Sequence, residues 1–220
     1  SYLPNYREFY EKRHFAAGGT VEADGWIRLP GVGDADVDRP DDPDAAERAP
    51  FGDALVTDLP GTALGVLVAD CTPVLPHDLA VPLVGAAHAG RPGMVGRVVR
   101  RLVEAMRDLG ATDLRATVGP SVCGRCYEVP EDTRAEAGLI EPTSASTTSW
   151  GTPALDVAAG VLAQLERSGV TSITRTGLGA HAGEGSWCTL EDERFYSYRR
   201  DGVTGRIAGV VVAAPRDGRG

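Results

Sequence analysis

The sequence predicts an α/β or α+β fold in which helices flank a mixed β-sheet within a single domain. Short apolar runs bounded by Gly, Pro and Asp are typical of buried strands, and they alternate with segments whose apolar residues recur at helical spacing. The chain has 220 residues, of which 42% are hydrophobic and 24% are charged, so it is long enough to bury one sizeable core. No internal repeat is visible in the sequence.

The first predicted unit begins with two apolar runs, residues 63–70 and 83–90, which we expect to be buried strands. Between Gly93 and Gly110 the apolar residues recur at helical spacing while arginines take other faces, which predicts an amphipathic helix capped by Gly110. Residues 114–120 predict a further strand, so the run has the length of one strand–helix–strand crossover.

The rest of the apolar pattern predicts one more helix and two strands. The helix is expected to begin near Pro153 and to end by Gly169, and the strands cover residues 172–177 and 207–214. Together these elements predict a mixed sheet covered by helices.

The domain organisation follows from one acidic stretch. Residues 30–50 are rich in Pro, Gly, Asp and Ala and contain few large apolar side chains, which predicts a linker or a long surface loop. This stretch separates an N-terminal segment of unclear origin, residues 1–29, from a regular body, residues 51–214.

The charge balance favours a small-molecule partner. The chain carries 22 basic and 31 acidic residues, and its net charge of -9 disfavours nucleic acid and anionic membranes as partners. No apolar run reaches the roughly 18 residues that span a bilayer, and the N-terminal stretch is too polar for a secretory signal, so we expect a cytoplasmic protein. Four cysteines are too few for a disulfide scaffold and are expected to be thiols or metal ligands. The oligomeric state is left open.

Two candidate metal ligands lie at the ends of predicted strands. Cys71 follows the first apolar run and His88 is close to the end of the next, so both side chains are expected at one edge of the sheet. A thiolate and an imidazole suit Zn²⁺, and one more protein ligand would leave the open position of a catalytic site. On spacing alone, both residues are also compatible with ordinary core positions.

Four sequence blocks resemble those of a known enzyme family. The blocks cover residues 69–75 (ADCTPVL), 86–93 (AAHAGRPG), 118–129 (VGPSVCGRCYEV) and 195–206 (FYSYRRDGVTGR), in this order. Over about residues 51–214 the chain is similar to the bacterial laccase-domain family, also called multicopper polyphenol oxidoreductases and purine nucleoside phosphorylases. The resemblance implies that Cys71 and His88 are catalytic residues that bind a zinc ion.

The third zinc ligand implied by the resemblance is a histidine in an upstream block that this sequence lacks. His14 is the only histidine before Cys71, and it is the tentative third ligand although its surroundings do not match that block. Many family members have Trp-Arg-Gly after the second block, whereas this chain has Arg91-Pro92-Gly93, which keeps an arginine as a candidate contact for an anionic substrate. The N-terminal residues 1–19 resemble a segment of the nitrilase-type glutaminase domain of NAD synthetases.

Other chemically active side chains favour structural roles. Cys123 and Cys126 form a CxxC pair without a second pair, for which packing beside the active site is the preferred interpretation, and Cys188 is expected to be structural. His77 and His181 lie in polar segments and are expected to be exposed. A basic cluster either binds phosphate or forms a solvated hairpin around Asp201-Gly202, and its members are Arg199, Arg200 and Arg206.

The resemblance implies a zinc-dependent phosphorylase that splits adenosine, inosine, guanosine and methylthioadenosine with phosphate and also deaminates adenosine. Three alternatives stay open. One is a copper-dependent polyphenol oxidase, which four histidines in the whole chain disfavour. The others are an inactive pseudoenzyme or binding module and an enzyme that edits peptidoglycan precursors.

Overall fold

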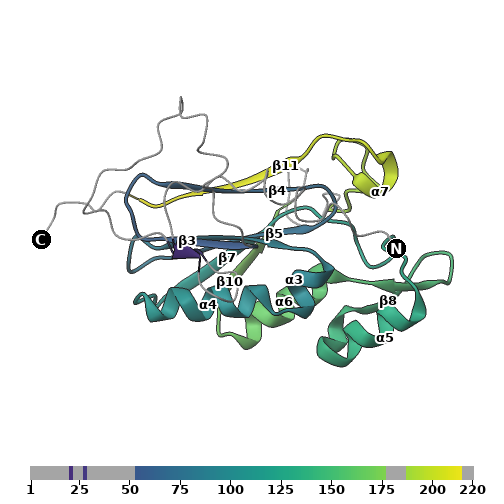
Figure 1. The fold of residues 1–220 in the computed structure, drawn as a ribbon, viewed down its shortest axis with the longest axis horizontal. Coiled ribbons are helices and arrows are strands. Elements are labelled where there is room, and N and C mark those ends of the chain that lie inside the picture. Colours follow the sequence, from purple (N-terminus) through teal and green to yellow (C-terminus); the bar gives the residue numbers. More distant parts are fainter. Residues whose placement is uncertain (1–19, 22–26, 29–52, 177–186, 215–220) are drawn as a thin grey trace, which may run out of the picture.

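The computed structural model describes residues 20–21, 27–28, 53–176 and 187–214. In this part of the chain a two-stranded sheet, a larger mixed sheet and a layer of helices are stacked on one another (Figure 1). The predicted fold class is therefore confirmed. His14, His181 and the acidic stretch 30–50 lie outside the described residues, and the domain boundary at residue 51 stays a prediction.

The central sheet has seven strands. Their order is β1 (Thr20–Val21), β2 (Ile27–Arg28), β3 (Ala54–Thr57), β6 (Val84–Ala89), β5 (Thr72–Asp78), β7 (Leu114–Val118) and β10 (Ser172–Arg175). The pairs β2–β3 and β7–β10 are parallel, whereas β5 is antiparallel to both of its neighbours, β6 and β7. Strands β6 and β7 therefore run in the same direction, as the predicted crossover requires.

Strand β5 is a central strand that the sequence analysis missed, because two prolines interrupt its apolar pattern. Pro73 and Pro76 cannot donate ladder hydrogen bonds, and proline is rare in the middle of a sheet. The pairing with β6 is interrupted around Pro76, where a Cβ on the facing Gly85 would lie 3.1 Å from the proline ring. The absence of a side chain at Gly85 therefore makes room for the proline.

One face of the central sheet is covered by helices. These are α3 (Arg91–Val95), α4 (Val98–Asp108) and α6 (Val157–Arg167), whose apolar sides pack against the sheet in the main core. The predicted helix from Gly93 to Gly110 is interrupted at Arg97, whose φ of 60° is left-handed. Helix α6 begins at Val157 rather than near Pro153, because the Asp156 carboxylate accepts a hydrogen bond from Ala159 N at 2.9 Å and caps the helix there.

The opposite face carries a second, smaller sheet. Strands β4 (Ala63–Val68) and β11 (Ile207–Val212) pair antiparallel above β5 and β6 (Figure 1). Alternate residues of β4 are buried, as expected for a strand with one face against a core. A second apolar cluster fills this interface, and its buried members are Leu55, Leu64, Val66, Val84, Ala86 and Ala213.

The remaining elements lie between the main strands. They are α5 (Glu131–Ile140), a 3-10 turn (Pro142–Ser144), β8 (Ala145–Thr147), β9 (Pro153–Leu155) and α7 (Tyr198–Asp201). Helix α7 replaces the hairpin considered around Asp201-Gly202. None of the helices in the described residues is both long enough and apolar enough to cross a bilayer.

The contact between α6 and its neighbours generates a prediction about Gly160. A Cβ at this position would lie 2.9 Å from Glu141 Cγ and would also overlap the Met94 side chain, and both neighbours are fully buried. We expect Gly160→Ala to lower the free energy of unfolding by about 1–3 kcal/mol, because overpacking outweighs the gain in helix propensity. Urea denaturation measures this effect.

Gly138→Ala in α5 is the matched control, because its nearest added contact, with Ala145 Cβ, is an ordinary 3.4 Å. That variant should be neutral or slightly stabilising. Equal stabilisation by both substitutions would contradict the proposed crowding around Gly160.

Candidate active site

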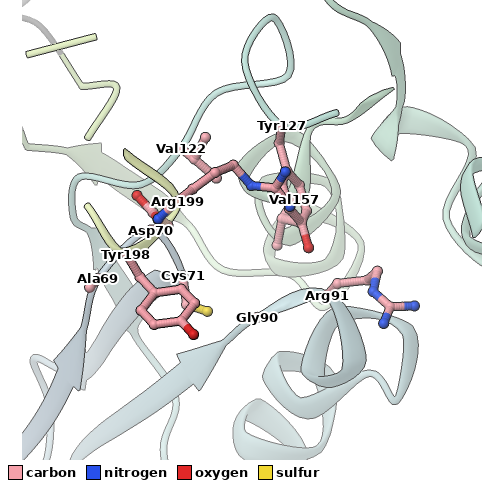
Figure 2. Close-up of a pocket in the computed structure, with 10 residues that line it drawn as sticks. All are labelled: Ala69, Asp70, Cys71, Gly90, Arg91, Val122, Tyr127, Val157, Tyr198 and Arg199. Atoms are coloured by element: carbon pink, nitrogen blue, oxygen red, sulfur yellow. The ribbon is translucent and has the colours of Figure 1, made fainter. Parts of the chain in front are cut away.

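A pocket of about 410 Å³ opens where the turn between β4 and β5 meets α3 and α7 (Figure 2). The side chains around it come from five separate stretches of the sequence. The lining residues are Ala69, Asp70, Cys71, Gly90, Arg91, Val122, Tyr127, Val157, Tyr198 and Arg199.

The Asp70 carboxylate holds the wall of this pocket together. One oxygen accepts a hydrogen bond from Thr189 Oγ1 at 2.6 Å, and the other accepts from Arg199 N, in the first turn of α7, at 2.7 Å. The Asp70 carbonyl also accepts from Val122 N at 3.0 Å. The residue has a φ of 86°, a left-handed conformation that aspartate tolerates better than most side chains.

Cys71 and His88, which the sequence analysis paired, lie in contact. Cys71 directly precedes β5, and His88 on β6 is opposite Pro73 of β5, so the sheet register brings the two residues together. Their side chains are close enough for Cys71 to raise the pKa of His88. A Cβ on Gly90 would lie 3.0 Å from Cys71 Sγ, so a larger residue at position 90 would press on the sulfur. Only Cys71 of the pair lines the pocket.

A carboxylate that the sequence analysis missed orients His88. Asp53 Oδ1 lies 3.3 Å from His88 Nδ1, and the Asp53 carbonyl accepts a hydrogen bond from His88 N at 2.8 Å. Burial alone would lower the pKa of His88, but the hydrogen bonds to Asp53 and Cys71 outweigh it and raise the pKa to about 9. Asp53 immediately precedes β3, and only the pairing of β3 with β6 reveals its role.

These residues fit a zinc ion. A thiol and an imidazole in contact are the donor types that zinc prefers, and the Asp53 interaction at Nδ1 leaves Nε2 as the ligand atom. A carboxylate behind a ligating histidine is a common way to fix the ring orientation. His14, the tentative third ligand, lies outside the described residues.

Two guanidinium groups make the pocket basic. Arg91 begins α3 at one side of the pocket, and in Figure 2 it lies on the other side of Cys71 from the Tyr198 ring. The Arg199 guanidinium stacks 4.5 Å above the centre of the Tyr127 ring and donates to the Glu128 carbonyl at 3.1 Å. Burial raises the pKa of Tyr127, an effect that Arg199 and Arg91 partly offset.

Arg200 and Arg206 do not contribute to this pocket. The Arg200 guanidinium donates to the carbonyls of Thr189 at 3.0 Å and Phe195 at 2.8 Å and pairs with Asp201. Arg206 donates to the Thr204 carbonyl at 2.8 Å. The basic cluster considered as a phosphate site therefore separates into one pocket residue and two residues that bind nearby loops.

The remaining cysteines gather beside the pocket. Cys126 and Cys188 are buried, and Cys123 N donates to Cys188 Sγ at 3.4 Å, so the three cysteines pack together, and their role stays a prediction. Glu191 joins them, with Oε1 at 3.3 Å from Cys126 Sγ, and this contact was missed because nothing in the sequence links residues 126 and 191. Burial and the Glu191 carboxylate raise the pKa of Cys126 to about 12. The cluster of three cysteines and one glutamate could hold a metal ion.

The structure corrects the expectation that His77 is exposed. It lies within β5 and is half-buried, not exposed in a polar segment, because that segment forms a central strand.

The pocket and its reactive groups define a class of protein. A thiol in contact with an imidazole, beside two guanidinium groups and aromatic rings in a pocket of this size, is typical of an enzyme that acts on small polar molecules. The chain matches the family model described as multi-copper polyphenol oxidoreductase laccase over residues 12–214. It therefore belongs to that family.

Named relatives agree with this assignment. The chain is 51% identical over 179 residues to the purine nucleoside phosphorylase SCO2081 of Streptomyces coelicolor, covering 80% of this chain and 70% of the relative. It is 56% identical over 164 residues to the purine nucleoside phosphorylase ORF3 of Streptomyces griseus, covering 74% of this chain and 63% of the relative. The chain thus spans about two thirds of the length of these relatives.

A solved structure shares the fold. The crystal structure of the Neisseria meningitidis protein NMB0706 is similar with a TM-score of 0.65 and 31% identity, covering 78% of this chain and 69% of that protein. The family resemblance drawn from the sequence blocks is confirmed by these matches. The resemblance of residues 1–19 to a glutaminase domain stays a prediction.

The contacts of His88 generate a pH prediction for zinc-free protein. Because the pKa of His88 is raised from 6.5 to about 9, its contribution to folding stability is fully present below pH 6.5 and is lost as the pH rises through about 9. Asp53→Asn removes the anionic partner, so it should lower this pKa and weaken the pH dependence. Ring resonances followed by NMR across this pH range, together with urea denaturation, measure both effects.

Asp58→Asn is the control, since it removes an acidic group that follows β3 at the end opposite to Asp53. It should leave the His88 titration unchanged. A His88 midpoint below pH 7 in unmodified, zinc-free protein would contradict the assigned contacts.

Proposed function

We propose that this protein is a zinc-dependent purine nucleoside phosphorylase that splits adenosine, inosine, guanosine and methylthioadenosine with phosphate, and that it deaminates adenosine as a second activity. The observation that carries the proposal is the contact between Cys71 and His88 beside a pocket that Arg91 and Arg199 line. The names of the two Streptomyces relatives support it.

The pocket suits a nucleoside together with phosphate. Its volume of about 410 Å³ is within the range of small-molecule sites. Tyr127 and Tyr198 offer ring faces against which a purine can stack. Two guanidinium groups can receive the phosphate through paired N–H donors, which explains a basic pocket in a chain of net charge -9.

Phosphorolysis requires a positively charged binding site for phosphate and a proton donor for the departing purine. In phosphorolysis a phosphate oxygen forms a bond to C1′ of the ribose, the glycosidic bond breaks, and its electron pair leaves with the purine, which then takes a proton. Arg91 and Arg199 would hold the anionic phosphate and stabilise the charge that develops. Burial raises the pKa of Tyr127, so its hydroxyl stays protonated at neutral pH and can donate a hydrogen bond inside the pocket.

Cys71 and His88 would hold the zinc ion, with His14 as the tentative third ligand and Asp53 fixing the His88 ring. When bound there, zinc would supply Lewis-acid chemistry that activates water for deamination of an adenine ring. Of these two residues, Cys71 lines the pocket, whereas His88 is buried and does not line it.

Copper-dependent phenol oxidation is the second candidate, favoured by the description of the family model. A multicopper cluster that reduces oxygen needs more histidines than the four in this chain. Editing of peptidoglycan precursors and a role as an inactive binding module are the remaining alternatives.

The test is release of free purine. Zinc-loaded protein incubated with adenosine and phosphate should yield adenine and ribose 1-phosphate, and a slower reaction should yield inosine, all resolved by chromatography. Cys71→Ser should reduce both reactions at least 100-fold, since losing even the outer partners of a metal ligand costs roughly 10–100-fold. Arg199→Gln should raise the KM for phosphate about tenfold or more while zinc content stays the same.

His77→Gln is the matched control, because this histidine lies on β5 outside the pocket, and its rates should equal those of the unmodified protein. His14→Ala should lower zinc content and rate together if His14 completes the ligand set. Full phosphorolysis by Cys71→Ser, or oxidation of phenols by the copper-loaded protein without purine release, would overturn the proposal.

A further inference from the structure

A second set of potential metal ligands lies outside the pocket. The ligand atoms of Cys123, Cys126, Cys188 and Glu191 all lie within 4.8 Å of one another. Cys126 and Cys188 are buried, Cys123 is half-buried, and Glu191 approaches from the surface. None of the four lines the pocket, and the proposed phosphorolysis uses none of them.

The spacing of these atoms is close to that of a tetrahedral zinc site. With Zn–S bonds of about 2.3 Å, two sulfur ligands at a tetrahedral angle lie about 3.8 Å apart. Cys126 Sγ already lies 3.3 Å from Glu191 Oε1, and the Cys123 and Cys188 sulfur atoms lie within 4.8 Å of each other. Small side-chain adjustments would therefore place all four ligand atoms around one ion.

The backbone holds the two cysteine-bearing segments in place. Ser121 and Cys188 form a β-bridge, in which Ser121 N donates to the Trp187 carbonyl at 3.0 Å and Thr189 N donates to the Ser121 carbonyl at 3.2 Å. Cys126 N donates to the Cys123 carbonyl at 3.0 Å, which closes a tight turn between the two thiols. Cys123 N also donates to Cys188 Sγ at 3.4 Å, which links the two segments.

We propose that Cys123, Cys126, Cys188 and Glu191 bind a zinc ion in a closed site whose role is structural. Three thiolates and a carboxylate are donors that zinc accepts, and four protein ligands leave no open position for a substrate. Four anionic ligands around a divalent cation leave excess negative charge, and the Arg125 guanidinium, 3.4 Å from Glu191 Oε1, offsets part of it.

The site would stiffen one wall of the pocket. Tyr127 directly follows Cys126, and Thr189, which directly follows Cys188, donates to the Asp70 carboxylate. An ion shared by the two segments would fix Tyr127 relative to the contact between Thr189 and Asp70. We therefore expect removal of this zinc to lower the melting temperature and to loosen the pocket.

The experiment uses the full chain with Cys71→Ser, so that the three cluster thiols are the only ones present. Under reducing conditions this variant is loaded with Co²⁺, which replaces zinc and shows a thiolate-to-metal charge-transfer absorption band. We expect about one Co²⁺ per chain with that band and its loss on addition of Zn²⁺. Adding Cys126→Ser should abolish tight binding. Adding Glu191→Gln should keep the band and weaken affinity by at least tenfold.

Glu193→Gln is the control, because it changes an acidic residue of the same segment outside the cluster, and it should bind Co²⁺ as the parent does. If circular dichroism shows that the Cys71→Ser parent is folded and it has no charge-transfer band, the proposal is overturned. A second outcome would also overturn it. Thiol titration of the metal-free variant would find one free thiol and a disulfide, and the reduced protein would still bind no metal.

The inference does not depend on the proposed function. The cobalt band is measured in a variant that lacks Cys71, so it reports on this cluster alone. If Cys71→Ser keeps its nucleoside activity, the proposed function fails and the cobalt result stands. If the nucleoside assay gives the expected result and the band is absent, only the proposal of a second zinc site is rejected.

Discussion

The Asp70 carboxylate is the interaction on which the candidate active site depends. It lies in the turn between β4 of the small sheet and β5 of the central sheet, and it binds Thr189 and the first turn of α7. A short helix such as α7 has little stability of its own, so its position is set by contacts of this kind. Through Asp70, one carboxylate places Arg199 and Tyr198 over the same pocket that contains Cys71.

The local patterns were sufficient to predict the fold class and the main elements, but not the order of the central strands. Helix α4 and strands β4, β6 and β7 follow apolar periodicities that packing against a core requires. Strand β5 was missed because Pro73 and Pro76 look like breakers, and their acceptance depends on Gly85 across the sheet. Such compensation between strands cannot be read from one segment.

The residues of the candidate site also divide into those that the sequence predicts and those that only the structure reveals. Cys71, His88 and Arg91 could be predicted because they lie in blocks with a recognisable family pattern, and the structure places all three at or beside one pocket. Asp53 and Glu191 could not, since both lie outside those blocks and acquire their partners only through tertiary contacts. Arg200 was assigned to the basic cluster by its neighbourhood in sequence, but its donors are used by loop carbonyls. A count of charges along the chain does not show which of them face a cavity.

The pairing of β4 with β11 has a consequence for the order of folding. Val68 is opposite Ile207, so the small sheet joins the two ends of the described body and cannot form until β11 has left the ribosome. Until then the apolar face of β4 has no partner strand. The turn with Asp70 and Cys71 also waits, because its contacts with Thr189 and Arg199 come from the same late segment. A nascent chain truncated before residue 187 would therefore carry all seven strands of the central sheet and still lack an assembled pocket.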